Sequence, residues 1–146
     1  GIDKKTREKV PFFDLTHNYI NKKWNEINTH NLVYTDIYRR KLLFENYEDL
    51  NRNKLFNYLI QANETESNIK KILLIQDYLL RENKKTKLVL YGYDSFLFDF
   101  SEQDGVETLK DIKSFLEAGI DLQSKHYTKS KMGLNYGEMK DITNRL

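Results

Sequence analysis

Two apolar runs flank one polar pair in the stretch Lys87-Leu88-Val89-Leu90-Tyr91-Gly92-Tyr93-Asp94-Ser95-Phe96-Leu97-Phe98-Asp99-Phe100. Residues 87–93 and 96–100 are rich in aliphatic and aromatic side chains, which favour strands. Asp94-Ser95 is a compact polar pair of the kind that occupies tight turns. The pattern predicts a β-hairpin over about residues 87–100 with a carboxylate at its tip.

The residues before this hairpin predict the longest helix of the chain, over about residues 51–83. A polar insert at residues 63–68 is either a break in this helix or an exposed face of it. Seven apolar residues can be placed on one buried side of the helix. They are Leu55, Leu59, Ile69, Ile72, Leu73, Leu79 and Leu80.

The first part of the chain predicts a helix followed by a short hairpin. The helix covers about residues 10–28, and Pro11 suits its first turn, where a missing N–H donor costs little. Residues 32–35 and 41–44 are two short apolar and aromatic runs, which predict the hairpin. The apolar stripe of the helix is expected from residues at three- and four-residue steps. They are Phe13, His17, Ile20, Trp24 and Ile27.

The last part of the chain predicts a turn at Asp104-Gly105, a helix over residues 106–118 and a final strand near residues 123–128. Strands and helices are mixed without regular alternation. The expected fold class is therefore α+β, with an antiparallel sheet packed against helices.

The composition suits one folded domain over residues 1–146, because 39% of the residues are hydrophobic and 13% are aromatic. The chain has no Cys, which excludes disulfides, thiolate metal sites and thiol nucleophiles, and its three scattered His argue against a histidine-built zinc site. The apolar runs are too short for a membrane-spanning helix. A formal net charge of +2 does not by itself indicate a polyanionic partner.

Asp94 is the first candidate for chemistry. A hard cation such as Mg²⁺ prefers oxygen ligands and is often held by one or two carboxylates plus substrate phosphates. A carboxylate at a rigid hairpin tip meets that need, whereas Asp99 is five positions further and is expected on the opposite face of the strand. The alternative is that Asp94 simply forms the turn.

Two further candidates are polar clusters. Asn53, Asn57 and Gln61 follow one another at four-residue steps, so their amides share one helix face and are able to contact base edges and sugars. Arg39-Arg40-Lys41 places three cations in a row, which suits phosphate binding. The alternatives are a solvated helix face and an ordinary exposed basic turn.

In chain order, these pieces resemble the C-terminal palm segment of a family A DNA polymerase of phage type. That family has a Thr and an Arg-rich run in a hairpin, and the corresponding residues here are Thr35 and Arg39-Arg40-Lys41. A helix with an Arg-x-x-x-Asn-x-x-x-Gln pattern follows, with an acidic residue beyond it. Here that helix reads Asn53, Asn57 and Gln61, with Glu66 beyond.

The resemblance continues through the hairpin to the end of the chain. The family's His-Asp-Glu hairpin corresponds to Tyr93-Asp94-Ser95, and its Gly-x-Asn-Trp-like ending corresponds to Gly133-Leu134-Asn135-Tyr136. His is replaced by Tyr93, the last acid by Ser95, and the Arg of the helix by Asn53. The triplet also resembles the Tyr-Gly-Asp-Thr-Asp-Ser signature of family B polymerases, but the preceding amide-bearing helix favours family A.

The resemblance implies that Asp94 is one of two aspartates that hold catalytic Mg²⁺. It implies that Asn57 and Gln61 line the minor groove of the primer-template. The Arg39-Arg40-Lys41 run would contact the nucleic-acid backbone. The full set of implied nucleic-acid-binding residues is Asn53, Asn57, Gln61, Arg39, Arg40, Lys41, Tyr93 and Ser95.

No segment matches the family's second metal-binding Asp or the nucleotide-binding Lys and Arg of its fingers helix. We therefore expect a fragment or one piece of a split enzyme, in which Mg²⁺ is shared with an Asp outside this chain. The implied partners are primer-template DNA, the upstream remainder of the polymerase and, through that remainder, a deoxynucleoside triphosphate. The implied location is the cytoplasm, that of a bacterial host if the chain is phage-encoded. The alternatives are a non-catalytic nucleic-acid-binding module and a structural or interaction domain.

Overall fold

The computed structural model describes residues 11–44, 49–118 and 126–146. The described residues contain three α-helices and small antiparallel two-stranded sheets, so the α+β class is confirmed. The chain divides into two compact units, an N-terminal unit of residues 1–64 and a C-terminal unit of residues 65–146. The single domain predicted over residues 1–146 stays a prediction.

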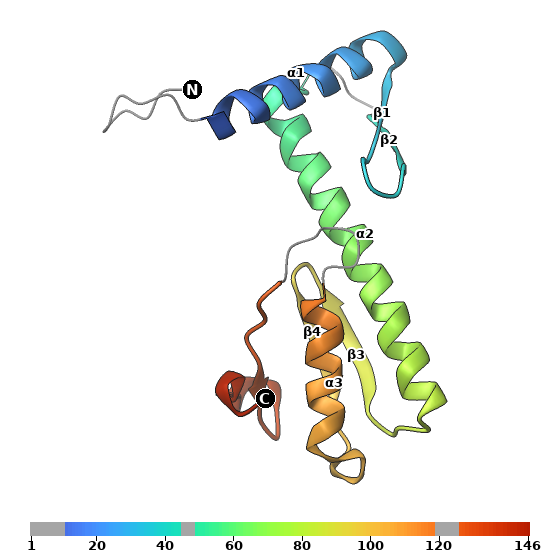
Figure 1. The fold of residues 1–146 in the computed structure, drawn as a ribbon, viewed down its shortest axis with the longest axis vertical. Coiled ribbons are helices and arrows are strands. Elements are labelled where there is room, and N and C mark those ends of the chain that lie inside the picture. The colour runs from blue at the N-terminus through green and yellow to red at the C-terminus, as the bar shows by residue number, and fades with distance from the viewer. Residues whose placement is uncertain (1–10, 45–48, 119–125) are drawn as a thin grey trace, which may run out of the picture. The chain divides into compact units, whose positions relative to one another are not determined.

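The N-terminal unit contains α1 (Pro11–His30), β1 (Leu32–Tyr34), β2 (Lys41–Leu43) and the first part of α2 (Arg52–Arg81), as Figure 1 shows. The helix and hairpin predicted here are confirmed, although His17 is exposed. Asn51 caps α2, because its side-chain oxygen accepts a hydrogen bond of 2.9 Å from the backbone N–H of Lys54. The buried cluster of this unit consists of Ile27, Val33, Leu55 and Leu59.

The polar insert of α2 neither breaks the helix nor forms an exposed face as a whole. Helix α2 is continuous from Arg52 to Arg81, and Glu66, Ser67 and Asn68 are buried. The expected exposed face is therefore wrong for these three positions. A helix buries positions that recur at three- and four-residue steps whatever their polarity. Here the buried stripe runs through Asn68, Lys71, Ile75 and Leu79.

The same geometry explains why part of the predicted apolar side of α2 is exposed. Leu55, Leu59 and Leu79 are buried as expected. Ile69, Leu73 and Leu80 are exposed instead, because they lie beside the buried stripe and not on it. Ile75, which is completely buried, takes the core position that the sequence analysis did not assign.

The C-terminal unit is built on β3 (Lys87–Gly92), β4 (Ser95–Asp99), the 3₁₀ turn η1 (Glu102–Asp104) and α3 (Gly105–Glu117). The hairpin predicted over residues 87–100 is formed, with a bulge between Leu88 and Leu90. Figure 1 shows α3 and the second part of α2 beside this hairpin. Their shared core consists of Ile75, Leu79 and Ile112, with Tyr78, Phe98, Phe115 and Leu116 packed against it.

Asp104 connects the start of β3 to the start of α3. Its carboxylate accepts hydrogen bonds of 2.6 Å from both the backbone N–H and the hydroxyl of Thr86, and others from the backbone N–H of Lys85. Its carbonyl accepts a 2.8 Å hydrogen bond from the hydroxyl of Thr108 in α3. The hydrogen bonds from Thr86 and Lys85 lower the pKa of Asp104. The predicted turn at Asp104-Gly105 is thus also a junction between two elements, and Gly105 there has a φ of +73°.

The end of the chain forms a small hairpin of β5 (Lys131–Met132) and β6 (Lys140–Asp141), with the 3₁₀ turns η2 (Tyr136–Glu138) and η3 (Thr143–Arg145). Of the strand predicted near residues 123–128, residues 123–125 lie outside the described residues. The prediction is wrong for residues 126–128, which form no strand. The N–H groups of His126 and Thr128 instead bind Glu117 at the end of α3. In the described part of the chain the strands form three separate two-stranded sheets. None of the described helices has the length and hydropathy of a membrane-spanning segment.

Candidate functional site

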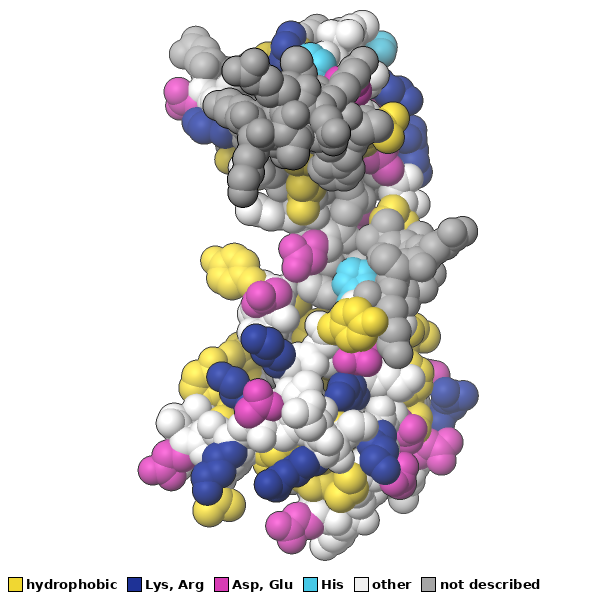
Figure 2. Space-filling view, turned by 60° about the vertical axis from the view of Figure 1, so that its left-hand side comes forward, with side chains coloured by type: hydrophobic (Ala, Val, Ile, Leu, Met, Phe, Trp, Pro, Cys, Tyr) yellow, Lys and Arg dark blue, Asp and Glu magenta, His cyan; other side chains and the backbone are white. Residues whose placement is uncertain are grey.

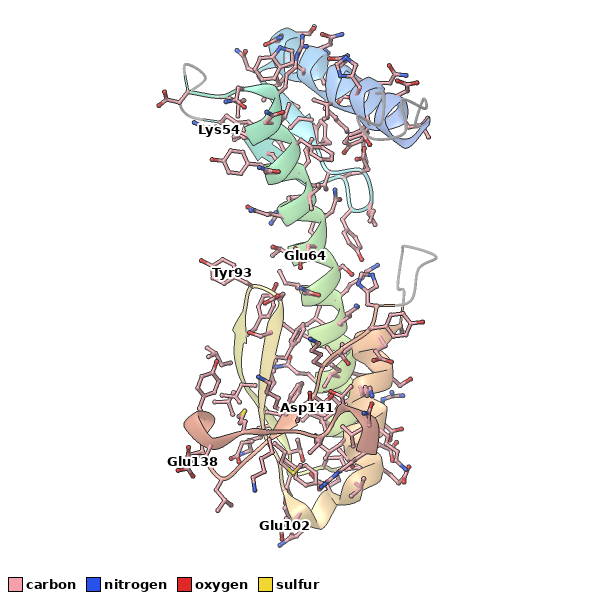
Figure 3. The ribbon with its side chains drawn as sticks, turned by 90° about the vertical axis from the view of Figure 1, so that its left-hand side faces the viewer. Lys54, Glu64, Tyr93, Glu102, Glu138 and Asp141 are labelled. Carbon is pink, nitrogen blue, oxygen red and sulfur yellow. The ribbon has the colours of Figure 1, made fainter. Side chains whose placement is uncertain are left out.

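Asp94 lies in the two-residue turn at the tip of the β3–β4 hairpin. Gly92 and Ser95 on either side of this turn are directly opposite one another in the ladder, and the Asp94 side chain is exposed. Tyr93, the other turn residue, is 95% exposed and has a φ of +53°. Figure 3 shows the Tyr93 ring pointing away from the tip. A bulky residue seldom adopts this left-handed conformation, which is costly unless its surroundings hold it there.

Asn68 of α2 holds the tip of this hairpin. Its side-chain nitrogen lies 3.3 Å from the carbonyl oxygen of Tyr93 and 3.4 Å from the hydroxyl oxygen of Tyr91, and Asn68 is only 9% exposed. The Ser95 hydroxyl donates a 2.8 Å hydrogen bond to the carbonyl of Gly92 and so closes the turn from within. The sequence analysis missed Asn68, although it precedes Ile75 and Leu79 at helical steps.

The tip offers a single carboxylate to a cation. Asp99 lies at the far end of β4, where it is paired with Lys87, so it cannot join Asp94. The Ser95 hydroxyl is engaged with Gly92. Among the described residues, no three His, Asp or Glu side chains are grouped as metal ligands. This donor set fits one protein ligand of a shared Mg²⁺ site and does not fit a complete site.

The loop that joins β1 and β2 presents the basic run of the N-terminal unit. Arg39, Arg40 and Lys41 are all exposed. The Arg39 guanidinium lies 5.1 Å from the centre of the Tyr34 ring, and Arg39 has a φ of +57°. The backbone N–H of Arg40 donates a 2.8 Å hydrogen bond to the hydroxyl of Thr35, which is completely buried. The basic side chains are therefore carried by a well-defined loop.

A buried lysine of α1 holds the same loop. Lys23 is 3% exposed, and its ammonium group lies 2.8 Å from the Asp36 carboxylate and 3.0 Å from the carbonyl oxygen of Tyr34. The Tyr19 hydroxyl donates a second hydrogen bond to Asp36. Burial, and then the hydrogen bond to Asp36, raise the pKa of Tyr19. Burial opposes ionisation of Asp36, but the hydrogen bonds from Lys23 and Tyr19 outweigh it and lower the pKa of Asp36.

Asn53, Asn57 and Gln61 are all exposed along the first part of α2, whereas Leu55 and Leu59 are buried. The three amides therefore lie on a surface of the N-terminal unit, as their four-residue spacing predicts. Six of the candidate residues belong to the N-terminal unit, and Tyr93, Asp94 and Ser95 belong to the C-terminal unit.

Comparison with family models, with curated proteins and with solved structures finds no match for this chain. The resemblance to the palm of a family A DNA polymerase therefore stays a hypothesis based on the order and spacing of the residues named above. Chemically, the described surfaces offer one exposed carboxylate on a held hairpin tip, one row of amides and one basic loop.

Proposed function

We propose that this chain is the C-terminal palm part of a template-directed DNA polymerase. The observation that carries the proposal is the exposed carboxylate of Asp94 in a two-residue turn, held from α2 by the buried amide of Asn68. Residues that hold catalytic ions must be fixed in position, and this turn is fixed by a side chain that is itself buried. The co-linear order of the basic loop, the amide row and the hairpin supports the same proposal.

In this function Asp94 would hold one of the Mg²⁺ ions, together with an Asp outside this chain. Bound Mg²⁺ would favour attack of the primer 3′ hydroxyl on the α-phosphate of the nucleotide and stabilise the pyrophosphate that leaves. Since one carboxylate does not hold two ions in place, we expect the chain alone not to extend a primer.

The N-terminal unit would bind the primer-template. Arg39, Arg40 and Lys41 carry positive charge on a loop held by buried groups, which suits contacts to phosphates. Amides both donate and accept hydrogen bonds, so Asn57 and Gln61 are able to contact minor-groove base edges of any sequence.

The decisive experiment is primer extension by the complete polymerase that contains this chain and its remaining parts, with Mg²⁺ as the metal. Asp94→Asn should lower kcat by roughly a thousandfold or more, since it removes a carboxylate ligand of the catalytic ions. Asp99→Asn is the matched control, because Asp99 is an exposed Asp of the same hairpin, and this variant should keep its activity. Full activity of Asp94→Asn would refute the proposal.

A second candidate is a nucleic-acid-binding module that kept the palm framework and lost the chemistry. Ser95 in place of the family's acid, and the single carboxylate at the tip, favour it. In that case the chain would bind primer-template with equal affinity in Mg²⁺ and in chelator, and no complementing polymerase part would accompany it. A structural or interaction domain would instead fail to bind DNA even at low salt, where phosphate contacts are strongest.

A further inference from the structure

The extended segment after α3 presents one aromatic ring and two cations in a row. Along residues 127–131, the residues alternate between exposed and half-buried. Tyr127, Lys129 and Lys131 are the exposed ones, and Tyr127 is 88% exposed. In an extended chain such alternate residues share one side and follow one another at intervals of about 6.6 Å.

The backbone of this row is held in place by polar contacts on its inner side. The N–H and hydroxyl of Thr128 both donate to the Glu117 carboxylate, at 3.0 and 3.1 Å. The N–H of Ser130 donates a 2.9 Å hydrogen bond to the hydroxyl of Thr143. The Tyr127 ring is thus carried on a held backbone with its face open to the solvent, and a ring presented in this way is able to stack on a base.

The neighbouring hairpin adds to the same surface. Lys140 of β6 is exposed, and so are Leu134 and Tyr136 in the loop that precedes it. This loop is tightly closed, because a side chain at Gly133 would place its Cβ 2.6 Å from the carbonyl oxygen of Glu138. Figure 2 shows Lys and Arg side chains among exposed apolar and acidic side chains on one face of the C-terminal unit, and Asp141 is paired with Lys131 across β5 and β6.

We propose that Tyr127, Lys129 and Lys131 form a binding row for single-stranded nucleic acid. An exposed ring stacks on a base of any sequence, and lysines at regular intervals neutralise phosphates. A duplex is a poorer ligand for this row, because its bases are already stacked and paired. The proposal is independent of the polymerase function, which places duplex contacts on the N-terminal unit.

The experiment measures binding of a short fluorescent oligothymidine to the whole chain as a function of salt. Tyr127→Ala should weaken binding about tenfold, whereas Tyr127→Phe should bind like the parent, since stacking needs only the ring. Charge reversal of both Lys129 and Lys131 should abolish most binding at about 50 mM salt, and replacing both with Gln should lower the salt slope by about 0.7 per lysine. Lys87→Glu together with Lys110→Glu is the matched double charge reversal outside the row and should bind nearly as well as the parent.

Several results would overturn the proposal. These are no oligothymidine binding at low salt, parent-like binding by Tyr127→Ala, or equally strong competition by polyglutamate, which would identify an acidic protein partner instead. Oligouridine in place of oligothymidine distinguishes an RNA ligand from a DNA ligand. Binding of a blunt duplex is measured beside that of oligothymidine. Loss of duplex binding alone would count against the proposed polymerase function, whereas loss of oligothymidine binding alone would count against this row.

Discussion

The two exposed loops that carry the candidate residues are held by buried side chains of different chemistry. A charged network of Lys23, Asp36 and Tyr19 holds the loop between β1 and β2. A neutral amide, Asn68, holds the tip between β3 and β4. A charged support is strong only while both partners are ionised. An amide support does not depend on pH and adds no charge to the tip.

Replacement of Lys23 should have the largest effect on the free energy of unfolding. Lys23→Met should lower the free energy of unfolding by about 2 to 3 kcal/mol, because the Asp36 carboxylate keeps only the Tyr19 hydroxyl and the Tyr34 carbonyl loses the ammonium group. The loss stays at the lower end of the range for buried pairs since the Asp36 side chain is 44% exposed. Urea unfolding measures it. Lys22→Met is the control, because the exposed Lys22 acts on Asp36 by its charge but makes no hydrogen bond to it. Equal losses in the two variants would show that Lys23 does not hold the loop.

Replacement of Asn68 should have a smaller effect on the free energy of unfolding, and a more local one. Asn68→Ala should cost about 1 to 2 kcal/mol, since the carbonyl of Tyr93 and the hydroxyl of Tyr91 lose a donor. Hydrogen exchange should accelerate at the tip of the β3–β4 hairpin. Asn57→Ala removes an exposed amide from the same helix and should change neither quantity appreciably. An unchanged exchange rate at the tip in Asn68→Ala would contradict this role of Asn68.

These supports mark the limit of what could be predicted from the sequence. The hairpin of residues 87–100 and the helices were predictable, because apolar spacing and turn residues report directly on local structure. The positions of Lys23 and Asn68 were not, because a polar residue is buried only where a distant group satisfies it, and no local pattern encodes that partner. Leu73 and Leu80 were predicted to be buried and are exposed, since apolar character alone does not decide which side of a helix faces a neighbouring element.

Lowering the pH should destabilise the loop between β1 and β2 more than the tip between β3 and β4. The pKa of Asp36 is lowered in the folded chain, so its contribution is complete above the ordinary value of 3.8 and is lost as the pH falls through the lower folded value. We expect the amides of residues 35–40 to exchange faster relative to those of residues 91–95 as the pH falls below that ordinary value. Exchange measured by mass spectrometry, corrected for intrinsic rates, tests this. Asp36→Asn should remove the pH dependence, and parallel acceleration at both loops in the parent chain would contradict the assignment.

Each loop also contains one residue with a left-handed backbone conformation. Replacing these residues should have the smallest effect on the free energy of unfolding. Tyr93 at φ +53° has an almost fully exposed ring, so Tyr93→Gly should relieve strain and raise the free energy of unfolding by up to about 1 kcal/mol. Arg39 at φ +57° stacks on Tyr34, so Arg39→Gly loses about as much from this contact as it gains from the backbone and should be nearly neutral. Thermal unfolding of the two variants compares them directly. A stabilised chain that binds primer-template less well after Tyr93→Gly would show that the strained tyrosine is kept for binding, whereas loss of stability would show that its ring packs in the folded chain after all.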